Sequence, residues 1–86
     1  MIITVKTVGS IVEMILMITE IIKFHSQLNK GEAVKIITTQ YETYIDKTDL
    51  VKIERRHLLI FRANGCKIAI NNRYIVACCV VRGSYV

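Results

Sequence analysis

The sequence predicts an α+β fold in a single domain, residues 1–86, with one N-terminal amphipathic helix followed by a four- to five-stranded antiparallel meander. Three observations lead to this fold class. A chain of 86 residues can bury one core but not two. Apolar residues recur with helical spacing over residues 10–30 and alternate along much of residues 33–82. The pair Asn64-Gly65 lies between two alternating segments, where it is typical of a hairpin turn.

The N-terminal third of the chain predicts a short strand and then a helix. Residues 1–9 include a run of β-branched side chains, which favours an extended conformation. Ser10 then acts as an N-cap, and Glu13 three positions later completes a capping box. Asn29-Lys30-Gly31 is a typical helix stop, so we expect the helix over residues 10–30.

This helix carries more apolar side chains than one buried face can hold. A helical wheel places its main apolar face at Ile11, Met14, Ile15, Ile18, Ile21, Ile22 and Leu28. Four further apolar side chains flank or interrupt the opposite polar stripe: Val12, Leu16, Met17 and Phe24. They are either isolated exposed residues or a self-association surface, whose simplest partner is the same helix of a subunit related by a two-fold axis. The composition, 52% hydrophobic and 22% charged, favours self-association, so we expect a homo-oligomer, with a dimer as the first choice.

Beyond the helix the apolar pattern becomes that of strands. Residues 33–45 predict one long strand or a bent pair, and Asp46-Lys47-Thr48-Asp49 predicts a turn after it. Four further strands are expected at residues 50–56, 58–63, 66–71 and 74–82. The last of these is apolar on both faces. This pattern favours a central strand covered on two sides, as in a closed small barrel or a dimer.

The Asn64-Gly65 pair also predicts strand register. A type I′ turn needs positive φ at both central residues, and Asn and Gly tolerate it best. With that turn, Arg62 lies directly opposite Lys67. Two opposed cations repel each other, so a bound anion would stabilise the pair.

Basic residues gather on the predicted strands and turns around this pair. Twelve Lys and Arg against seven Asp and Glu give a net charge of +5, which favours anionic partners. The basic side chains either extend into solvent, with a neutralising neighbour such as Glu54, or contact phosphates while Tyr44 or Tyr74 stacks on bases. The candidate nucleic-acid or anion contacts are Lys52, Arg55, Arg56, Arg62, Lys67 and Arg73.

The cysteines indicate neither a disulfide framework nor a metal site. Cys66, Cys78 and Cys79 are odd in number and have no metal-ligand spacing. A metal site that adds His25 or His57 is the alternative, but neighbouring residues on a strand, such as Cys78 and Cys79, point to opposite faces. We therefore expect no metal, no cofactor and a reducing, cytoplasmic environment.

The remaining polar residues form no catalytic pattern. The acids are few and mostly occupy helix and turn positions, no histidine lies beside a suitable nucleophile, and the four glycines form no phosphate loop. We therefore expect a protein that is not an enzyme. Glu13 and Glu20 interrupt the apolar N-terminal region, so we also expect no membrane insertion.

The order of one helix and about five short antiparallel strands over residues 10–82 resembles that of the Sm-like and SH3-like small barrels. The glycine, aspartate and asparagine signature of the first Sm motif is absent, so the likeness is one of element order. Two functions remain open. The first is a self-associating protein-interaction module of adaptor, assembly or inhibitor type, and the second is a small barrel that binds nucleic acid through a basic strand face, largely independently of sequence.

Overall fold

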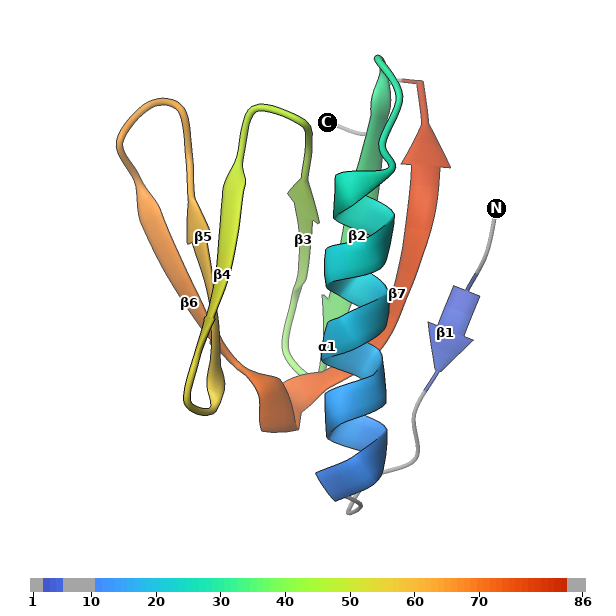
Figure 1. Ribbon diagram of the computed structural model, residues 1–86, viewed down its shortest axis with the longest axis vertical. Helices are drawn as coiled ribbons and strands as arrows, with labels where there is room; N and C mark the ends of the chain where they lie inside the picture. The colour runs from blue at the N-terminus through green and yellow to red at the C-terminus, as the bar shows by residue number, and fades with distance from the viewer. Residues whose placement is uncertain (1–2, 6–10, 84–86) are drawn as a thin grey trace.

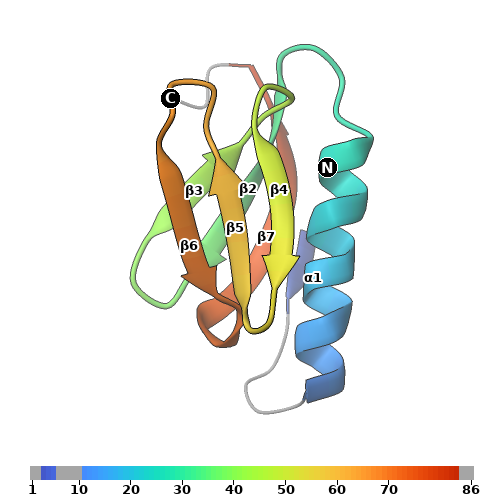
Figure 2. The same cartoon turned by 60° about the vertical axis from the view of Figure 1, so that its left-hand side comes forward.

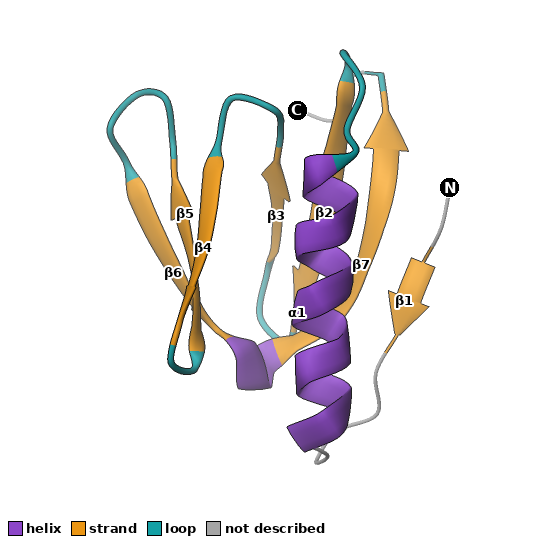
Figure 3. Ribbon diagram, viewed as in Figure 1, coloured by secondary structure: helices purple, strands orange, loops and turns teal. Residues whose placement is uncertain are grey.

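The computed structural model describes residues 3–5 and 11–83 and shows one α-helix packed against antiparallel sheets (Figure 1). The α-helix is α1 (Ile11–Ser26), and a short 3₁₀-helix, η1, spans Asn72–Tyr74. The strands are β1 (Ile3–Val5), β2 (Glu32–Thr38), β3 (Glu42–Ile45), β4 (Leu50–Glu54), β5 (His57–Phe61), β6 (Lys67–Asn71) and β7 (Ile75–Arg82). Figure 3 separates the helices from the strands by colour. The predicted α+β class is confirmed.

The strands are divided between two sheets, and the prediction of one meander is wrong. One sheet has the order β1-β7-β2-β3, and the other has the order β4-β5-β6. The chain meanders only through β4, β5 and β6, because β7 returns to lie between β1 and β2 (Figure 2). This central position suits a strand that is apolar on both faces, as predicted. The pairings among the described residues do not close into a barrel.

The helix packs on β7 and β2, and its buried face differs from the predicted one. Met17 and Phe24, which the wheel assigned to a free surface, are only 1% and 5% exposed. They belong to a core that joins the helix to residues of both sheets, so their assignment to a self-association surface is wrong. The side chains between the two sheets select which stripe of the helix is buried, and a wheel contains no such information. Leu16 remains 57% exposed, and the side chain of Val12 lies outside the described ones.

Two segment boundaries also differ from the predictions. The helix ends at Ser26, because the N–H groups of Gln27 and Leu28 bond to carbonyls three residues back rather than four. Gly31, at φ +82, then turns the chain into β2. Of the two alternatives for residues 33–45, one long strand or a bent pair, the structure shows a pair of strands, the β2–β3 hairpin.

The β5–β6 hairpin has neither the predicted turn nor the predicted register. The Arg62 N–H donates to the Cys66 carbonyl at 2.8 Å, and the Gly65 N–H donates to the Arg62 carbonyl at 3.0 Å. Gly65 has φ +91, whereas Asn64 is not among the residues with positive φ. The loop therefore has three residues, as in a type I turn followed by a glycine bulge, and the extra residue shifts the register by one. Lys67 pairs with Phe61, so the predicted opposition of Lys67 to Arg62 is wrong.

Candidate nucleic-acid interface

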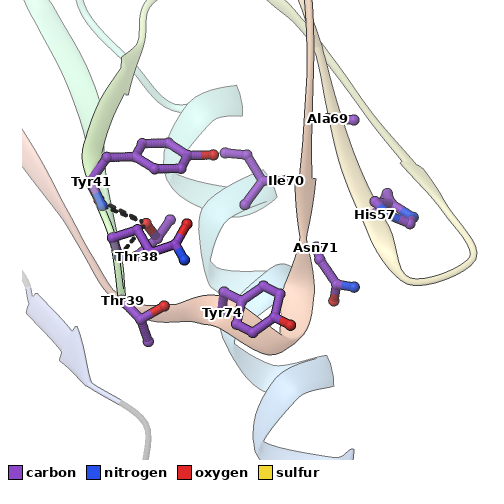
Figure 4. A pocket seen from close by; sticks show the side chains of 9 residues that line it. Thr38, Thr39, Tyr41, His57, Ala69, Ile70, Asn71 and Tyr74 are labelled. Carbon is purple, nitrogen blue, oxygen red and sulfur yellow. Dashed lines mark hydrogen bonds between the residues drawn. The ribbon is translucent and has the colours of Figure 1, made fainter.

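A pocket of about 280 Å³ lies between the β2–β3 turn and the segment that joins β6 to β7 (Figure 4). It has two aromatic side chains, several amide and hydroxyl groups, and no acidic residue among those that line it. Figure 4 shows Tyr41 and Tyr74 reaching it from different elements. The lining residues are Thr38, Thr39, Gln40, Tyr41, His57, Ala69, Ile70, Asn71 and Tyr74.

Thr38 holds the wall formed by the β2–β3 turn. Its hydroxyl oxygen accepts the N–H groups of Gln40 at 3.2 Å and Tyr41 at 2.9 Å, and the hydroxyl donates to the Tyr41 carbonyl at 2.9 Å. A threonine that satisfies three backbone groups in this way fixes the path of a tight turn. The turn presents the Tyr41 ring at the pocket, 45% exposed.

Asn71 and Tyr74 form the opposite wall. The Asn71 side-chain oxygen accepts the Arg73 N–H at 3.0 Å and caps η1. The Tyr74 carbonyl accepts the Thr39 N–H at 3.0 Å, which joins the two walls through the backbone. Tyr74 is 52% exposed, so both tyrosine rings are accessible to a ligand while their backbones are held.

Three exposed arginines lie next to this pocket. Arg55 and Arg56 form the two-residue turn between β4 and β5, and Arg73 lies in η1. The Arg56 carbonyl accepts the Asn72 N–H at 2.8 Å, so this turn and η1 are adjacent. Arg55 adopts φ 55, a backbone conformation that residues other than glycine and asparagine rarely adopt. Three of the six sequence-predicted anion contacts are thus brought together.

Arg62 is not part of this group, and its prediction as an available anion contact is wrong. Its guanidinium donates to Asp49 Oδ2 at 2.7 Å, to Thr43 Oγ1 at 3.1 Å and to the Tyr44 carbonyl. The Asp49 side chain is only 4% exposed. A guanidinium held by a buried carboxylate and two further acceptors has an internal structural role. Tyr44, the other predicted stacking residue, does not line the pocket.

Lys52 and Lys67 lie apart from the arginines, on the β4-β5-β6 sheet. Lys67 Nζ lies over the ring of Phe61, 5.6 Å from its centroid. Two acids neighbour residues that line the tyrosine pocket: Glu54 is paired across the β4–β5 turn with His57, and Glu42 follows Tyr41 in the chain. Glu42 accepts a hydrogen bond from Lys35 at 3.2 Å, and this contact raises the pKa of the lysine. One acid near the tyrosine pocket therefore already has a cation.

Sequence reasoning missed most of the pocket. Gln40 and Tyr41 are adjacent, but Asn71 lies about 30 residues farther along the chain, and no short-range pattern connects it with them. The polar run Thr38–Tyr41 between two apolar segments was the available signal, since such runs form turns. Among the described residues, no three His, Cys, Asp or Glu side chains lie close enough to hold a metal ion.

Comparisons of the chain with protein-family models, with curated proteins and with solved structures gave no match. Within the described residues, no helix has both the length and the apolar content needed to cross a bilayer.

Proposed function

We propose that this protein binds single-stranded nucleic acid, largely independently of sequence, at the tyrosine pocket and its arginine rim. One observation carries the proposal: Tyr41 and Tyr74 are exposed in a pocket without acids, beside Arg55, Arg56 and Arg73. Tyrosine rings offer stacking surfaces to any base, and guanidinium groups contact phosphates. The same combination serves single strands rather than duplexes, whose base faces are already stacked.

The remainder of the fold supports a single-stranded ligand. The only α-helix in the described residues packs on β7 and β2 and exposes the apolar side chains of Leu16 and Ile22, which suits a recognition helix poorly. Gln40 and Asn71 supply amides that can bond to base edges, although two amides provide little sequence discrimination. The proposal also includes a small barrel-like arrangement that strand pairing leaves open, supported by the single core that residues of both sheets share.

Fluorescence anisotropy with labelled 12-nucleotide oligo(U) and oligo(dT) tests the proposal. Tyr41→Ala and Tyr74→Ala should each weaken binding by about 1–3 kcal/mol, the usual contribution of one stacked base. Arg56→Gln and Arg73→Gln should each lower the slope of log affinity against log salt concentration by about 0.7.

Lys30→Gln is the matched control. Lys30 is exposed in the loop between α1 and β2, at the opposite end of the molecule from η1 (Figure 1). This variant removes the same charge and should leave the salt slope unchanged. Absence of any oligonucleotide binding by the wild-type protein at low salt would exclude the proposed function.

Self-association is a second candidate, favoured by the exposure of Leu16 (57%) and Ile22 (37%) on α1. Met17 and Phe24 no longer support it. If the outer surface of α1 forms a dimer contact, Leu16→Glu should lower the mass measured by light scattering. An unchanged monomer mass for both proteins would remove this candidate.

A further inference from the structure

Cross-strand register places three rows of side chains on one face of the β4-β5-β6 sheet. Directly paired residues share a face, and alternate residues along a strand return to it. The rows run from the tyrosine pocket toward the β5–β6 hairpin. They are Glu54, His57 and Asn71, then Lys52, Leu59 and Ala69, then Leu50, Phe61 and Lys67. We call this surface the outer face, because the intervening residues Leu58, Ile60 and Ile70 point into the core.

Most side chains of the outer face are open to solvent. Leu50 is 71% exposed, and Lys52, Lys67 and Ala69 are exposed as well, whereas Leu59 at the centre of the face is 6% exposed. Figure 2 shows β4, β5 and β6 at the front of the molecule, with no other described element across them. A ligand can therefore reach the whole length of these strands.

The outer face and the tyrosine pocket are continuous. His57, Ala69 and Asn71 line the pocket and also belong to the first two rows. A chain that leaves the pocket along β6 therefore passes onto the outer face rather than into solvent. At about 3.3 Å per residue, the distance from Asn71 to Lys67 is about 13 Å. Stacked nucleotides rise about 3.4 Å each, so this distance corresponds to about four nucleotides.

The chemistry of the outer face suits a polyanion with aromatic groups. Lys52 and Lys67 provide two cations, and Lys67 lies over the half-buried ring of Phe61. The one acid of the face, Glu54, lies in the first row beside the arginine turn. The charge at the far end of the face is therefore positive only, which favours phosphates.

We infer that the outer face continues the nucleic-acid site, so that the ligand is an oligonucleotide of several residues rather than a mononucleotide or dinucleotide. This inference rests on the proposed function. The tyrosine pocket holds one end of the bound strand, and Lys52 and Lys67 contact phosphates farther along it. Affinity should therefore rise with strand length until the outer face is covered.

A length series of labelled oligo(U), with 2, 4, 8 and 12 nucleotides, tests this inference with the 86-residue chain. Wild-type affinity should rise at least tenfold between 2 and 8 nucleotides and then level off. The double variant Lys52→Gln, Lys67→Gln should lose this rise and bind the 2-mer as well as wild type does. For the 12-mer its salt slope should fall by about 1.4, or about 0.7 for each lost contact.

The control double variant is Lys23→Gln, Lys30→Gln, which removes two exposed lysines near the end of α1. It should retain the wild-type length dependence, and thermal melting should show that both double variants are folded. If Tyr74→Ala weakens the 12-mer but the Lys52, Lys67 variant does not, the inference is overturned and the proposed function stands. If no oligonucleotide of any length binds the wild-type protein, both are overturned.

Discussion

The Arg62 guanidinium lies 2.7 Å from Asp49 Oδ2 and thereby ties the end of β5 to the turn before β4. The same carboxylate oxygen accepts the Asp46 N–H at 2.9 Å, so one buried acid organises both the turn and the arginine. Because the β5–β6 loop has three residues, Arg62 lies beside Cys66 in the hairpin and is not paired with Lys67.

Arg62→Ala should destabilise the protein by about 2 kcal/mol, because it leaves the Asp49 carboxylate buried with fewer donors. The double variant Arg62→Ala, Asp49→Asn should be destabilised by less than the sum of the two single-variant effects, since the two residues interact directly. Urea unfolding of the two single variants and the double variant measures this coupling. Oligonucleotide affinity should stay at the wild-type value, and a large loss in folded Arg62→Ala would place Arg62 at the interface after all.

Gly65→Ala should destabilise the hairpin through its backbone alone. Gly65 has φ +91, and a Cβ at this position would meet no atom within 4 Å. The expected cost is therefore the left-handed penalty of about 1–2 kcal/mol. Gly65→Asn should cost less, because asparagine tolerates this region better than alanine. Equal unfolding free energies for wild type and Gly65→Ala would contradict the bulged turn.

Arg55→Gly should stabilise the fold and weaken nucleic-acid binding. Relief of the positive φ at Arg55 should contribute about 1 kcal/mol, while removal of the guanidinium should lower the salt slope by about 0.7. Arg56→Gly is the matched control, since Arg56 has no positive φ and should not be stabilised by glycine. Thermal melts and binding titrations on both variants separate the two effects. A stabilised Arg55→Gly protein that binds as wild type does would remove Arg55 from the interface.

Phe24→Ala should destabilise the protein by about 3–5 kcal/mol, the usual cost of truncating a buried phenylalanine. Leu16→Ala, eight residues earlier on the same helix, should change stability by no more than about 0.5 kcal/mol if Leu16 is exposed in solution. Chemical denaturation provides both numbers. Similar effects for the two variants would mean that α1 is rotated or that Leu16 is covered by a second subunit.

The stability of the folded protein should depend on the ionisation of Glu32 at acidic pH. The backbone N–H of Asn29 and then the Arg82 side chain stabilise the carboxylate and lower its pKa below the ordinary value of 4.5. A carboxylate whose pKa is lower in the folded protein stabilises the fold at pH values above its unfolded-state pKa. This stabilisation is lost as the pH falls through its folded-state pKa. Glu32→Gln should therefore flatten the fall in melting temperature below pH 4.5. Gln27→Glu adds a carboxylate at an exposed position without such partners. It should leave the pH dependence of the melting temperature as it is in the wild-type protein.

Much of the secondary structure could be predicted because local signals agree with the fold. The capping residues placed the helix start near Ile11, and alternation located each strand within a few residues. The turn at residues 46–49 was also correct, since its two aspartates accept backbone N–H groups within the turn itself. The register between β5 and β6 was harder to predict from the sequence. Asn64-Gly65 fits both a two-residue and a three-residue loop, and only the pairing of the finished sheet distinguishes them.

The candidate site was predictable only in part. Arg55, Arg56 and Arg73 could be named as basic residues, and Tyr74 as a stacking residue, because charge and aromaticity are visible in the sequence. Their adjacency depends on a hydrogen bond between Arg56 and Asn72. Tyr41 joins them through the β2–β3 hairpin, for which the sequence predicted either one long strand or a bent pair.

The sequence by itself determined the α+β class, the element order and the central position of the last strand, because these follow from periodicity and from the residues beside each turn. Only the tertiary structure decided which helix stripe is buried, which cation lies opposite which residue and which loops meet at the tyrosine pocket. Those properties depend on how two sheets and a helix share one core. A single extra residue in the β5–β6 loop changes the cross-strand partner of every residue in β6, and it places Lys67 beside Phe61.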